Sequence, residues 1–289
     1  MNPTWRSEDQ TTFGPIGPLG WIVALCRGIV LALVLFSGLV LLLLLRLIER
    51  PLFGVHRPWT PWITVMVCRA ALRIIGLPVQ SSGKPMRHPG VIVANHSSWL
   101  DIFVLNAAQP LYFVSKSEVA RWPGIGWLAR ATGTVFVERD RKQAKVHQQV
   151  FEDRLRAGHR LLFFPEGTSS DGRRVLGFKP TLFAAVFSPD LAGLSVQPVT
   201  VAYHAPDGRD ARHYGWWGDM DFGPHLLQML ATLGHGRVQV TWHASLAVDD
   251  FSGRKDLSFA AEAAVRGSHP NGSDDPVEQA GEGGNRIVG

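Results

Sequence analysis

The apolar positions of this chain form one long uninterrupted run near the N-terminus and many short runs after it. No charged residue occurs from Gly28 to Leu45, and the run extends back to Trp21 if Arg27 is tolerated. A run of this length can cross the ~30 Å hydrocarbon core of a bilayer. A signal peptide is usually shorter and ends in a small-residue cleavage site, which Leu41–Leu45 does not offer. We therefore predict a membrane helix and favour a transmembrane helix over a monotopic one, which run length alone does not exclude.

A second apolar segment, Ile63–Gly76, is amphipathic. It follows Pro58-Trp59-Thr60-Pro61-Trp62, and its two arginines, Arg69 and Arg73, share one helix face because they are four residues apart. Tryptophans, an apolar face and arginines that extend toward water are typical of a helix at a membrane interface. An amphipathic helix packed on a globular domain would have the same pattern, and the two interpretations are compatible.

From Val79 onward, short apolar runs alternate with helix-like segments. The strand candidates are Val91–Ala94, Tyr112–Ser115, Val135–Val137, Leu161–Phe164, Val196–Val201 and Val238–His243. The helix candidates are Leu100–Ala108, Gly126–Ala131, Lys142–Arg156 and Phe222–Leu233, with Thr181–Phe187 as a short helix. This alternation predicts an α/β fold with a mostly parallel sheet flanked by helices, preceded by N-terminal transmembrane or monotopic membrane helices.

These patterns divide the chain into four regions. Residues 1–20 contain several prolines and glycines and are expected to form a flexible arm. Residues 21–76 hold the membrane-associated helices, and residues 77–265 form the α/β domain. Residues 266–289 are rich in Gly, Ser, Asp and Glu and are expected to be a disordered tail.

Charge adds a membrane orientation to this picture. The formal net charge is +5, and the basic residues are concentrated in the first two-thirds of the chain, which suits an anionic membrane surface or an anionic substrate. No basic block or nucleic-acid motif is present, so we expect no nucleic-acid partner. Arg46, Arg50 and Arg57 follow the long apolar run, and the positive-inside rule then predicts a domain facing the cytoplasm from the inner membrane. Cys26 and Cys68 suggest neither a disulfide framework nor a metal site.

A histidine and an aspartate follow the first buried strand. His96 comes after Val91–Ala94 and Asn95, and Asp101 lies five residues later, at the start of a predicted helix. Positions five apart on a helix are about 140° apart, so the two side chains meet only if His96 precedes the helix. The carboxylate would then fix the tautomer of the imidazole, as in the base half of a catalytic triad. Alternatively, Ser98-x-x-Asp101 is a capping box and Asp101 only caps the helix.

A second buried strand leads into the polar turn Phe164-Pro165-Glu166-Gly167-Thr168. In an open α/β sheet, ligands bind beyond the carboxyl ends of the strands. We therefore expect His96 and Glu166 to border one cleft.

Asn-His-x4-Asp followed downstream by Phe-Pro-Glu-Gly-Thr resembles the glycerolipid acyltransferase family, the 1-acyl-glycerol-3-phosphate acyltransferases and their relatives. Two further blocks match in order: Gly133–Arg139 and Val196–Val201. The resemblance covers about residues 80–205 and marks 77–265 as an acyltransferase domain. It implies transfer of a fatty acyl chain from acyl-CoA or acyl-carrier protein to a lysolipid hydroxyl at a membrane, without a cofactor or metal.

The resemblance also implies roles for individual residues. His96 would act as general base, oriented by Asp101, and Arg139 would contact the acceptor head group. The Glu-Gly-Thr turn would help to bind substrate through Glu166, Gly167 and Thr168. Separately, Lys116 is a candidate contact for the thioester carrier, with an exposed surface lysine as the alternative.

The chain departs from the family pattern at Ser169, where the family usually has an arginine that holds an acceptor phosphate. Arg173, Arg174 and Lys179 are nearby basic residues that could compensate. Glu-Gly-Thr-Ser-Ser-Asp-Gly and the segment Tyr214–Met220 are more similar to the branch that acylates lyso-ornithine lipids. We therefore expect a lyso-ornithine lipid or another lysolipid as acceptor, with 1-acyl-glycerol-3-phosphate as the alternative.

Other function classes have less support. A serine hydrolase would need Gly-x-Ser-x-Gly, which does not occur, and His-x-Glu zinc motifs are also absent from the sequence. A non-catalytic membrane lipid-binding protein remains the alternative, but such a surface needs no imidazole–carboxylate pair.

Overall fold

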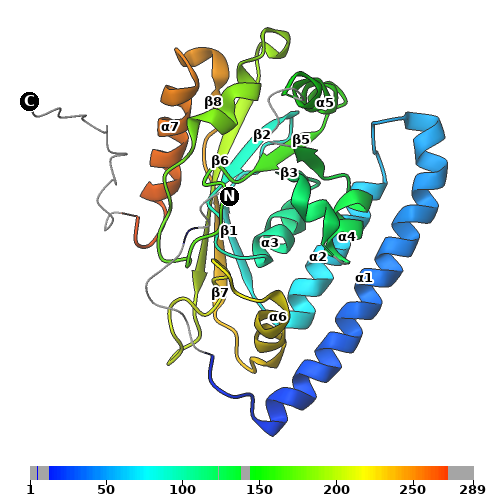
Figure 1. The fold of residues 1–289 in the computed structure, drawn as a ribbon, viewed down its shortest axis with the longest axis vertical. Coiled ribbons are helices and arrows are strands. Elements are labelled where there is room, and N and C mark those ends of the chain that lie inside the picture. Colours follow the sequence, from blue (N-terminus) through cyan, green and yellow to red (C-terminus); the bar gives the residue numbers. More distant parts are fainter. Residues whose placement is uncertain (1–4, 6–12, 123, 138–143, 273–289) are drawn as a thin grey trace, which may run out of the picture.

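The computed structural model of the chain describes Trp5 and residues 13–122, 124–137 and 144–272. Its centre is one sheet with the strand order β1-β7-β6-β2-β5-β3-β4, and β8 pairs with β6 (Figure 1). The strands are β1 (Val79–Gly83), β2 (Gly90–Ala94), β3 (Tyr112–Lys116), β4 (Val135–Val137), β5 (Arg160–Phe163), β6 (Ser195–His204), β7 (Arg237–Trp242) and β8 (Leu246–Ala247).

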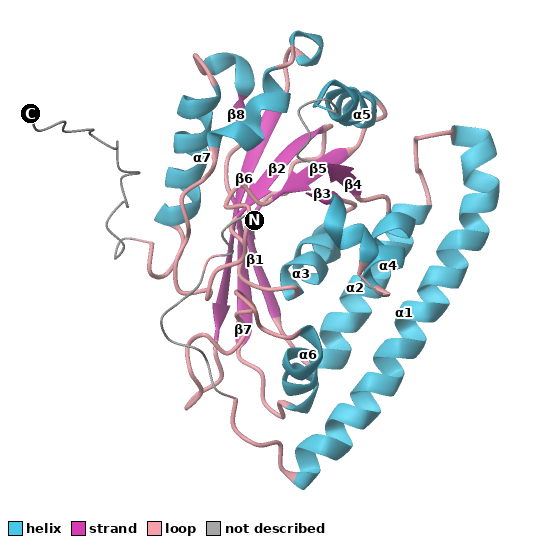
Figure 2. Cartoon of the chain, in the orientation of Figure 1, coloured by secondary structure: helices cyan, strands magenta, loops and turns pink. Residues whose placement is uncertain are grey.

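Helices lie on both sides of this sheet (Figure 2). The α-helices are α1 (Pro18–Phe53), α2 (Thr60–Ile75), α3 (Leu100–Ala108), α4 (Ile125–Thr132), α5 (Ala144–Arg156), α6 (Phe222–Ala231) and α7 (Arg254–Gly267). Short 3-10 helices are η1 (Ser117–Arg121), η3 (Pro180–Phe187), η4 (Pro189–Leu191) and η5 (Val248–Asp250).

The predicted mostly parallel sheet is confirmed. The pairs β1–β7, β2–β5, β2–β6, β3–β4 and β3–β5 are parallel. The exceptions are the antiparallel pairs β6–β7 and β6–β8. The carboxyl ends of β2, β5, β3 and β4 therefore lie at one edge of the sheet.

Alternate residues of the central strand enter two different cores, as expected for a sheet covered on both faces. Ile92 and Ala94 of β2 pack in the core shared with α1, α2, α3 and α6. Val91 and Val93 pack in the core shared with α5, η3 and α7. All four side chains are fully buried, which explains why β2 reads as a continuous apolar run.

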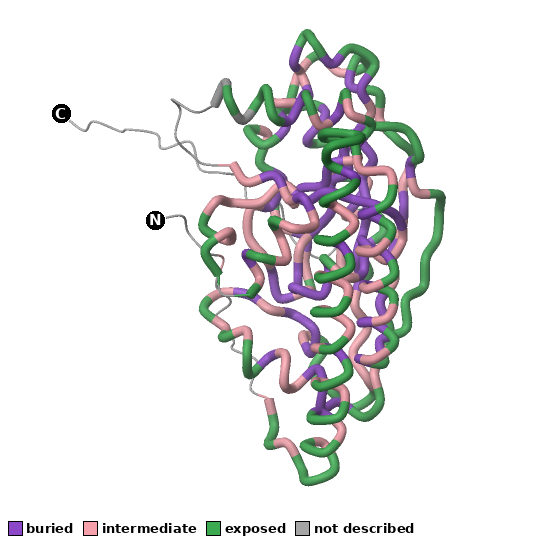
Figure 3. The backbone as a smooth tube through the Cα atoms, turned by 90° about the vertical axis from the view of Figure 1, so that its right-hand side faces the viewer, coloured by how far each residue is buried: buried purple, intermediate pink, exposed green. Residues whose placement is uncertain are grey.

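The long apolar helix α1 lies against the domain instead of projecting from it. It packs along α2 and α6, and Figure 3 shows much of its length exposed. Arg27 donates hydrogen bonds from Nη1 to the carbonyl oxygens of Leu230 (3.0 Å) and Thr232 (2.7 Å), at the end of α6. By length and composition α1 is the one helix among the described residues that could cross a membrane.

The structure changes the expected boundaries at both ends. Helix α1 begins at Pro18 rather than Trp21, because proline suits a first helical turn. Before the helix, the ring of Phe13 contacts the rings of His213 and His225. The arm is therefore packed on the domain from residue 13 onward. The expected disordered tail is wrong for residues 266–272, because α7 reaches Gly267 and His269 is buried. Residues 273–289 lie outside the described residues.

Candidate active site

The site begins where β2 ends. The side chain of Asn95 accepts a hydrogen bond from Val201 N and donates one to Val201 O, both 2.8 Å, which joins the end of β2 to β6. The next residue, His96, leaves the sheet, and α3 starts at Leu100. His96 therefore lies in the turn before the helix and Asp101 in its first turn, the arrangement that the spacing required.

The two side chains meet. His96 Nδ1 lies 2.8 Å from Asp101 Oδ2, which also accepts hydrogen bonds from the backbone amides of Ser97 (2.9 Å) and Ser98 (3.1 Å). Asp101 is fully buried, while the His96 side chain is 20% exposed. The carboxylate thus contacts the imidazole and stabilises the first turn of α3, so the orienting and capping interpretations hold together in geometry.

Tyr203 completes the surroundings of the carboxylate. Its hydroxyl, on β6, donates a 2.7 Å hydrogen bond to Asp101 Oδ1. Burial and the nearby carboxylate raise the pKa of Tyr203 well above its usual value, which keeps the phenol protonated as a donor. The sequence prediction missed Tyr203, because the predicted strand ended at Val201.

Glu166 reaches the same site from the end of β5, the parallel neighbour of β2. Its Oε1 accepts a hydrogen bond from His96 N at 3.2 Å, and the Phe164 ring stacks on the imidazole with centroids 4.0 Å apart. Glu166 is completely buried, and Oε2 has no hydrogen-bond partner within the described part of the chain. Burial raises the pKa of this carboxyl well above its usual value, so the neutral form is favoured.

The Glu-Gly-Thr turn lies beside the imidazole. Gly167 has a φ of +71°, which favours glycine, and a Cβ there would lie 2.9 Å from Lys179 Nζ. The backbone amides of Thr168 and Ser169 form no hydrogen bond to any described residue. They are therefore not used as donors within the described part of the chain.

The two other predicted site residues are Lys116 and Arg139. Lys116 ends β3 at the same edge of the sheet. Arg139 follows β4 but lies outside the described residues. Within the described residues, no group of three or more His, Cys, Asp or Glu side chains could hold a metal ion.

The nearby segment that includes Trp216 also reaches the site. Trp216 N donates a 2.8 Å hydrogen bond to Ser97 O, directly after the histidine. Its indole ring contacts Phe222 and Trp122 edge to face. The segment singled out in the sequence therefore forms one border of the turn that carries His96.

Comparison with known proteins identifies the family of the chain. Residues 78–202 match the Acyltransferase family model. The chain is 56% identical to a lyso-ornithine lipid O-acyltransferase from Rhodobacter capsulatus, over 91% of this chain and 96% of the relative. It is 35% identical to a protein of the same name from Rhizobium meliloti, over 83% of each chain.

The fold also matches a solved structure. The crystal structure of the 1-acyl-sn-glycerophosphate (LPA) acyltransferase from Thermotoga maritima superposes with a TM-score of 0.61 at 20% identity, covering 86% of this chain and 94% of that one. The histidine–aspartate pair, the Glu-Gly-Thr turn beside it and the extent of the similarity lead to one conclusion: the chain belongs to the acyltransferase family and is an acyltransferase.

Proposed function

We propose that this acyltransferase moves a fatty acyl chain from acyl-CoA or acyl-carrier protein to the hydroxyl of a lyso-ornithine lipid, with His96 as general base. The observation that carries the chemistry is the 2.8 Å contact between His96 Nδ1 and Asp101 Oδ2. With Nδ1 held by the carboxylate, Nε2 is the nitrogen that can receive a proton.

The reaction needs no acyl-enzyme. His96 Nε2 takes the hydroxyl proton of the acceptor while its oxygen attacks the carbonyl carbon of the thioester. The carbon–sulfur bond then breaks, and the departing sulfur takes the proton from the imidazolium to form a thiol. The buried carboxylate of Asp101 stabilises the imidazolium between these two steps.

Negative charge on the carbonyl oxygen needs donors that are already in position. The amides of Thr168 and Ser169 fit this role, because neither bonds to a described residue and both lie in the turn next to His96. The amides of Ser97 and Ser98 are less suited, since both already bond to Asp101.

The acceptor is inferred from the relatives and from the surroundings of Ser169. Arg174 is engaged with the buried Asp171 at 3.4 Å and with the Trp5 ring at 5.3 Å, so it does not replace the usual arginine of the family. A zwitterionic lyso-ornithine head group needs fewer cations than a phosphomonoester. The second candidate acceptor is 1-acyl-glycerol-3-phosphate, and the observation that favours it is Lys179 Nζ beside Gly167.

The test compares kcat/KM for lyso-ornithine lipid and lysophosphatidate, each with acyl-CoA and with acyl-carrier protein. The expected result is a preference for lyso-ornithine lipid, abolished activity in His96→Ala, and a shift toward lysophosphatidate in Ser169→Arg. A strong preference of the wild type for lysophosphatidate would reject the acceptor, and turnover in His96→Ala would reject the mechanism.

We infer further that α1 and α2 enter one leaflet of the cytoplasmic membrane, with the domain on the cytoplasmic side. The expected transmembrane helix is disfavoured by packing: α1 is about 54 Å long at 1.5 Å per residue, and it packs against both α2 and α6 of the domain. A spanning orientation would draw α6 and the sheet into the bilayer. Protease accessibility of tags at the two ends tests this, because one leaflet leaves both tags on the same side and spanning separates them.

A further inference from the structure

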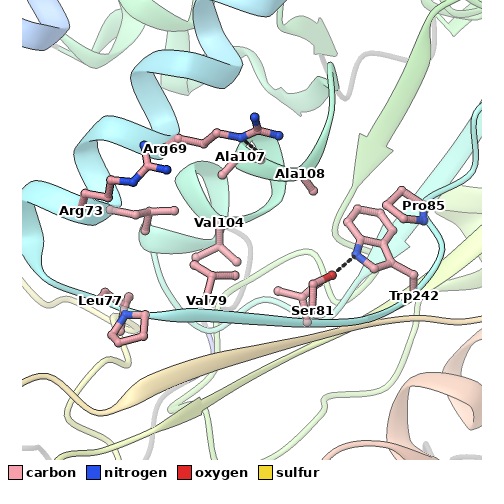
Figure 4. Close-up of a pocket in the computed structure, with 13 residues that line it drawn as sticks. Arg69, Arg73, Leu77, Val79, Ser81, Pro85, Val104, Ala107, Ala108 and Trp242 are labelled. Atoms are coloured by element: carbon pink, nitrogen blue, oxygen red, sulfur yellow. Dashed lines mark hydrogen bonds between the residues drawn. The ribbon is translucent and has the colours of Figure 1, made fainter.

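A second pocket lies away from the catalytic pair, between α2, α3 and the β1–β7 edge of the sheet. Its volume is about 450 Å³, within the usual range for small-molecule sites. Figure 4 shows Arg69 and Arg73 at one edge and Trp242 with Pro85 at the opposite edge. The other lining residues are apolar apart from Ser81, whose Oγ already accepts a 3.2 Å hydrogen bond from Trp242 Nε1.

The polar chemistry of the pocket is therefore that of its two arginines. Arg69 donates from Nε to Ala107 O at 2.7 Å, which leaves its terminal guanidinium nitrogens uncommitted. Arg73 forms no hydrogen bond or ion pair with a described residue, and no described lining residue is acidic. Like charges four residues apart on a helix repel each other, and a phosphate between them would remove this repulsion while accepting charge-assisted hydrogen bonds.

The exposed face of α2 that leads to the two arginines is suited to lipid. Trp62 and Met66 are 54% and 69% exposed and precede the two arginines on the same helix face. The other long side of α2 packs on the apolar helix α1, where Val67 meets Gly38. One face of α2 thus carries exposed apolar side chains next to the cationic edge of the pocket, a pairing that suits an anionic amphiphile.

The pocket is separate from the reacting groups. None of His96, Asp101 and Glu166 lines it. It contacts α3 through Val104, Ala107 and Ala108, of which Val104 lies one turn from Asp101, about 4.5 Å along the axis. The arginine edge lies farther away, because Arg69 bonds to Ala107 O, about 9 Å along the axis from Asp101.

We infer that this pocket binds one anionic phospholipid of the surrounding membrane, with its phosphate on Arg69 and Arg73 and an acyl chain between Val79 and Val104. This lipid is a bound membrane component and not the acyl acceptor. The lipid would link α2 to β1. Because its phosphate is held by two arginines, the site would distinguish anionic from neutral membrane lipids.

Native mass spectrometry of the full-length protein in detergent tests the inference, with phosphatidylglycerol and phosphatidylcholine as probes. The wild type should bind one phosphatidylglycerol more tightly than phosphatidylcholine. Arg73→Gln, an exposed substitution that removes no observed contact, should weaken phosphatidylglycerol binding by roughly tenfold or more, as expected for lost charge-assisted hydrogen bonds. Glycerol 3-phosphate, which lacks acyl chains, should not compete.

Two further variants make the result specific. Arg50→Gln removes the same charge from an exposed position on α1 outside the pocket and should bind like the wild type. Val79→Trp, on the exposed edge strand, should obstruct the pocket and weaken the binding of both lipids, while acyl transfer continues. Unchanged phosphatidylglycerol affinity in Arg73→Gln and Val79→Trp would overturn the inference. An altered acyl-chain preference of the enzyme in Val79→Trp, with unchanged lipid binding, would also overturn the inference. In that case the pocket would hold the acyl chain of a substrate and not a membrane lipid.

Discussion

Replacing Asp101 with asparagine removes the charge behind the imidazole while leaving its geometry almost unchanged. Three donors point at Oδ2, from His96, Ser97 and Ser98, and one points at Oδ1, from Tyr203. The asparagine oxygen would therefore occupy the Oδ2 position, and its NH2 group would face the Tyr203 hydroxyl. That hydroxyl can rotate and accept, so every hydrogen bond can be kept.

The expected loss is then electrostatic. An imidazolium and a carboxylate about 4 Å apart attract each other by about 4 kcal/mol at an effective dielectric constant of 20. This stabilisation exists only after His96 has taken the proton, so Asp101→Asn should lower kcat by about 10³-fold. KM should change little, because Asp101 is fully buried and cannot touch either substrate.

The assay measures kcat, KM and the thermal unfolding midpoint of the purified enzyme. Ser98→Ala is the matched control, since it removes the 3.3 Å hydrogen bond from Leu100 N to Ser98 Oγ but keeps the carboxylate. It should cost about 0.5–2 kcal/mol of stability and retain kcat. A loss of less than about tenfold in Asp101→Asn, together with a lower midpoint, would refute the reasoning and leave helix capping as the role of Asp101.

Three other substitutions probe the buried groups. Tyr203→Phe removes one hydrogen bond to Asp101 that exists before and after proton transfer, so it should lower the free energy of unfolding by about 1.5–3 kcal/mol and change kcat by less than about tenfold; an unaltered free energy of unfolding would contradict this. Glu166→Gln keeps the oxygen that accepts a hydrogen bond from the His96 amide. Because burial favours the neutral carboxyl, the free energy of unfolding should change by less than about 1 kcal/mol. A much larger loss of stability would mean that Glu166 is charged in the folded protein. Burial lowers the pKa of His225 to about 4, so as the pH falls this histidine is protonated in the unfolded chain before it is protonated in the folded one. The free energy of unfolding should therefore decrease between about pH 6.5 and about pH 4, by roughly 3 kcal/mol from this group. His225→Gln should flatten that decline in unfolding midpoint against pH, and an identical slope in both proteins would reject the assignment.

Local sequence patterns predicted the elements that carry the catalytic pair. The apolar run before Asn95 became β2, and the predicted helix Leu100–Ala108 has the observed bounds of α3. Both depend on residues close in sequence, as does the contact between His96 and Asp101. Parallel neighbouring strands then bring Glu166 to the same edge, a consequence of sheet topology.

Contacts between distant segments were not predictable in this way. Tyr203 bonds to Asp101 across 102 positions, and neither residue type signals the other. The helix α7 was missed although Leu257, Ala261 and Val265 recur at helical spacing, since small and charged residues between them lower its hydrophobicity. The residues that border the second pocket come from segments that lie side by side only after α2, α3 and β7 have packed.

The contact between Arg27 and Leu230 sets an order of events during synthesis. These residues are 203 positions apart, so α1 leaves the ribosome long before its partner α6 exists. Leu31 of α1 and Leu230 of α6 belong to one core with the sheet. This core therefore stays incomplete until α6 has been synthesised. With α1 in one leaflet, as proposed above, the membrane would cover its apolar surface during this interval, and the last third of the chain would then complete the core against a helix already in the bilayer. That proposal thus predicts that folding of this enzyme is coupled to the bilayer, and that a chain made without one would expose apolar surface and aggregate.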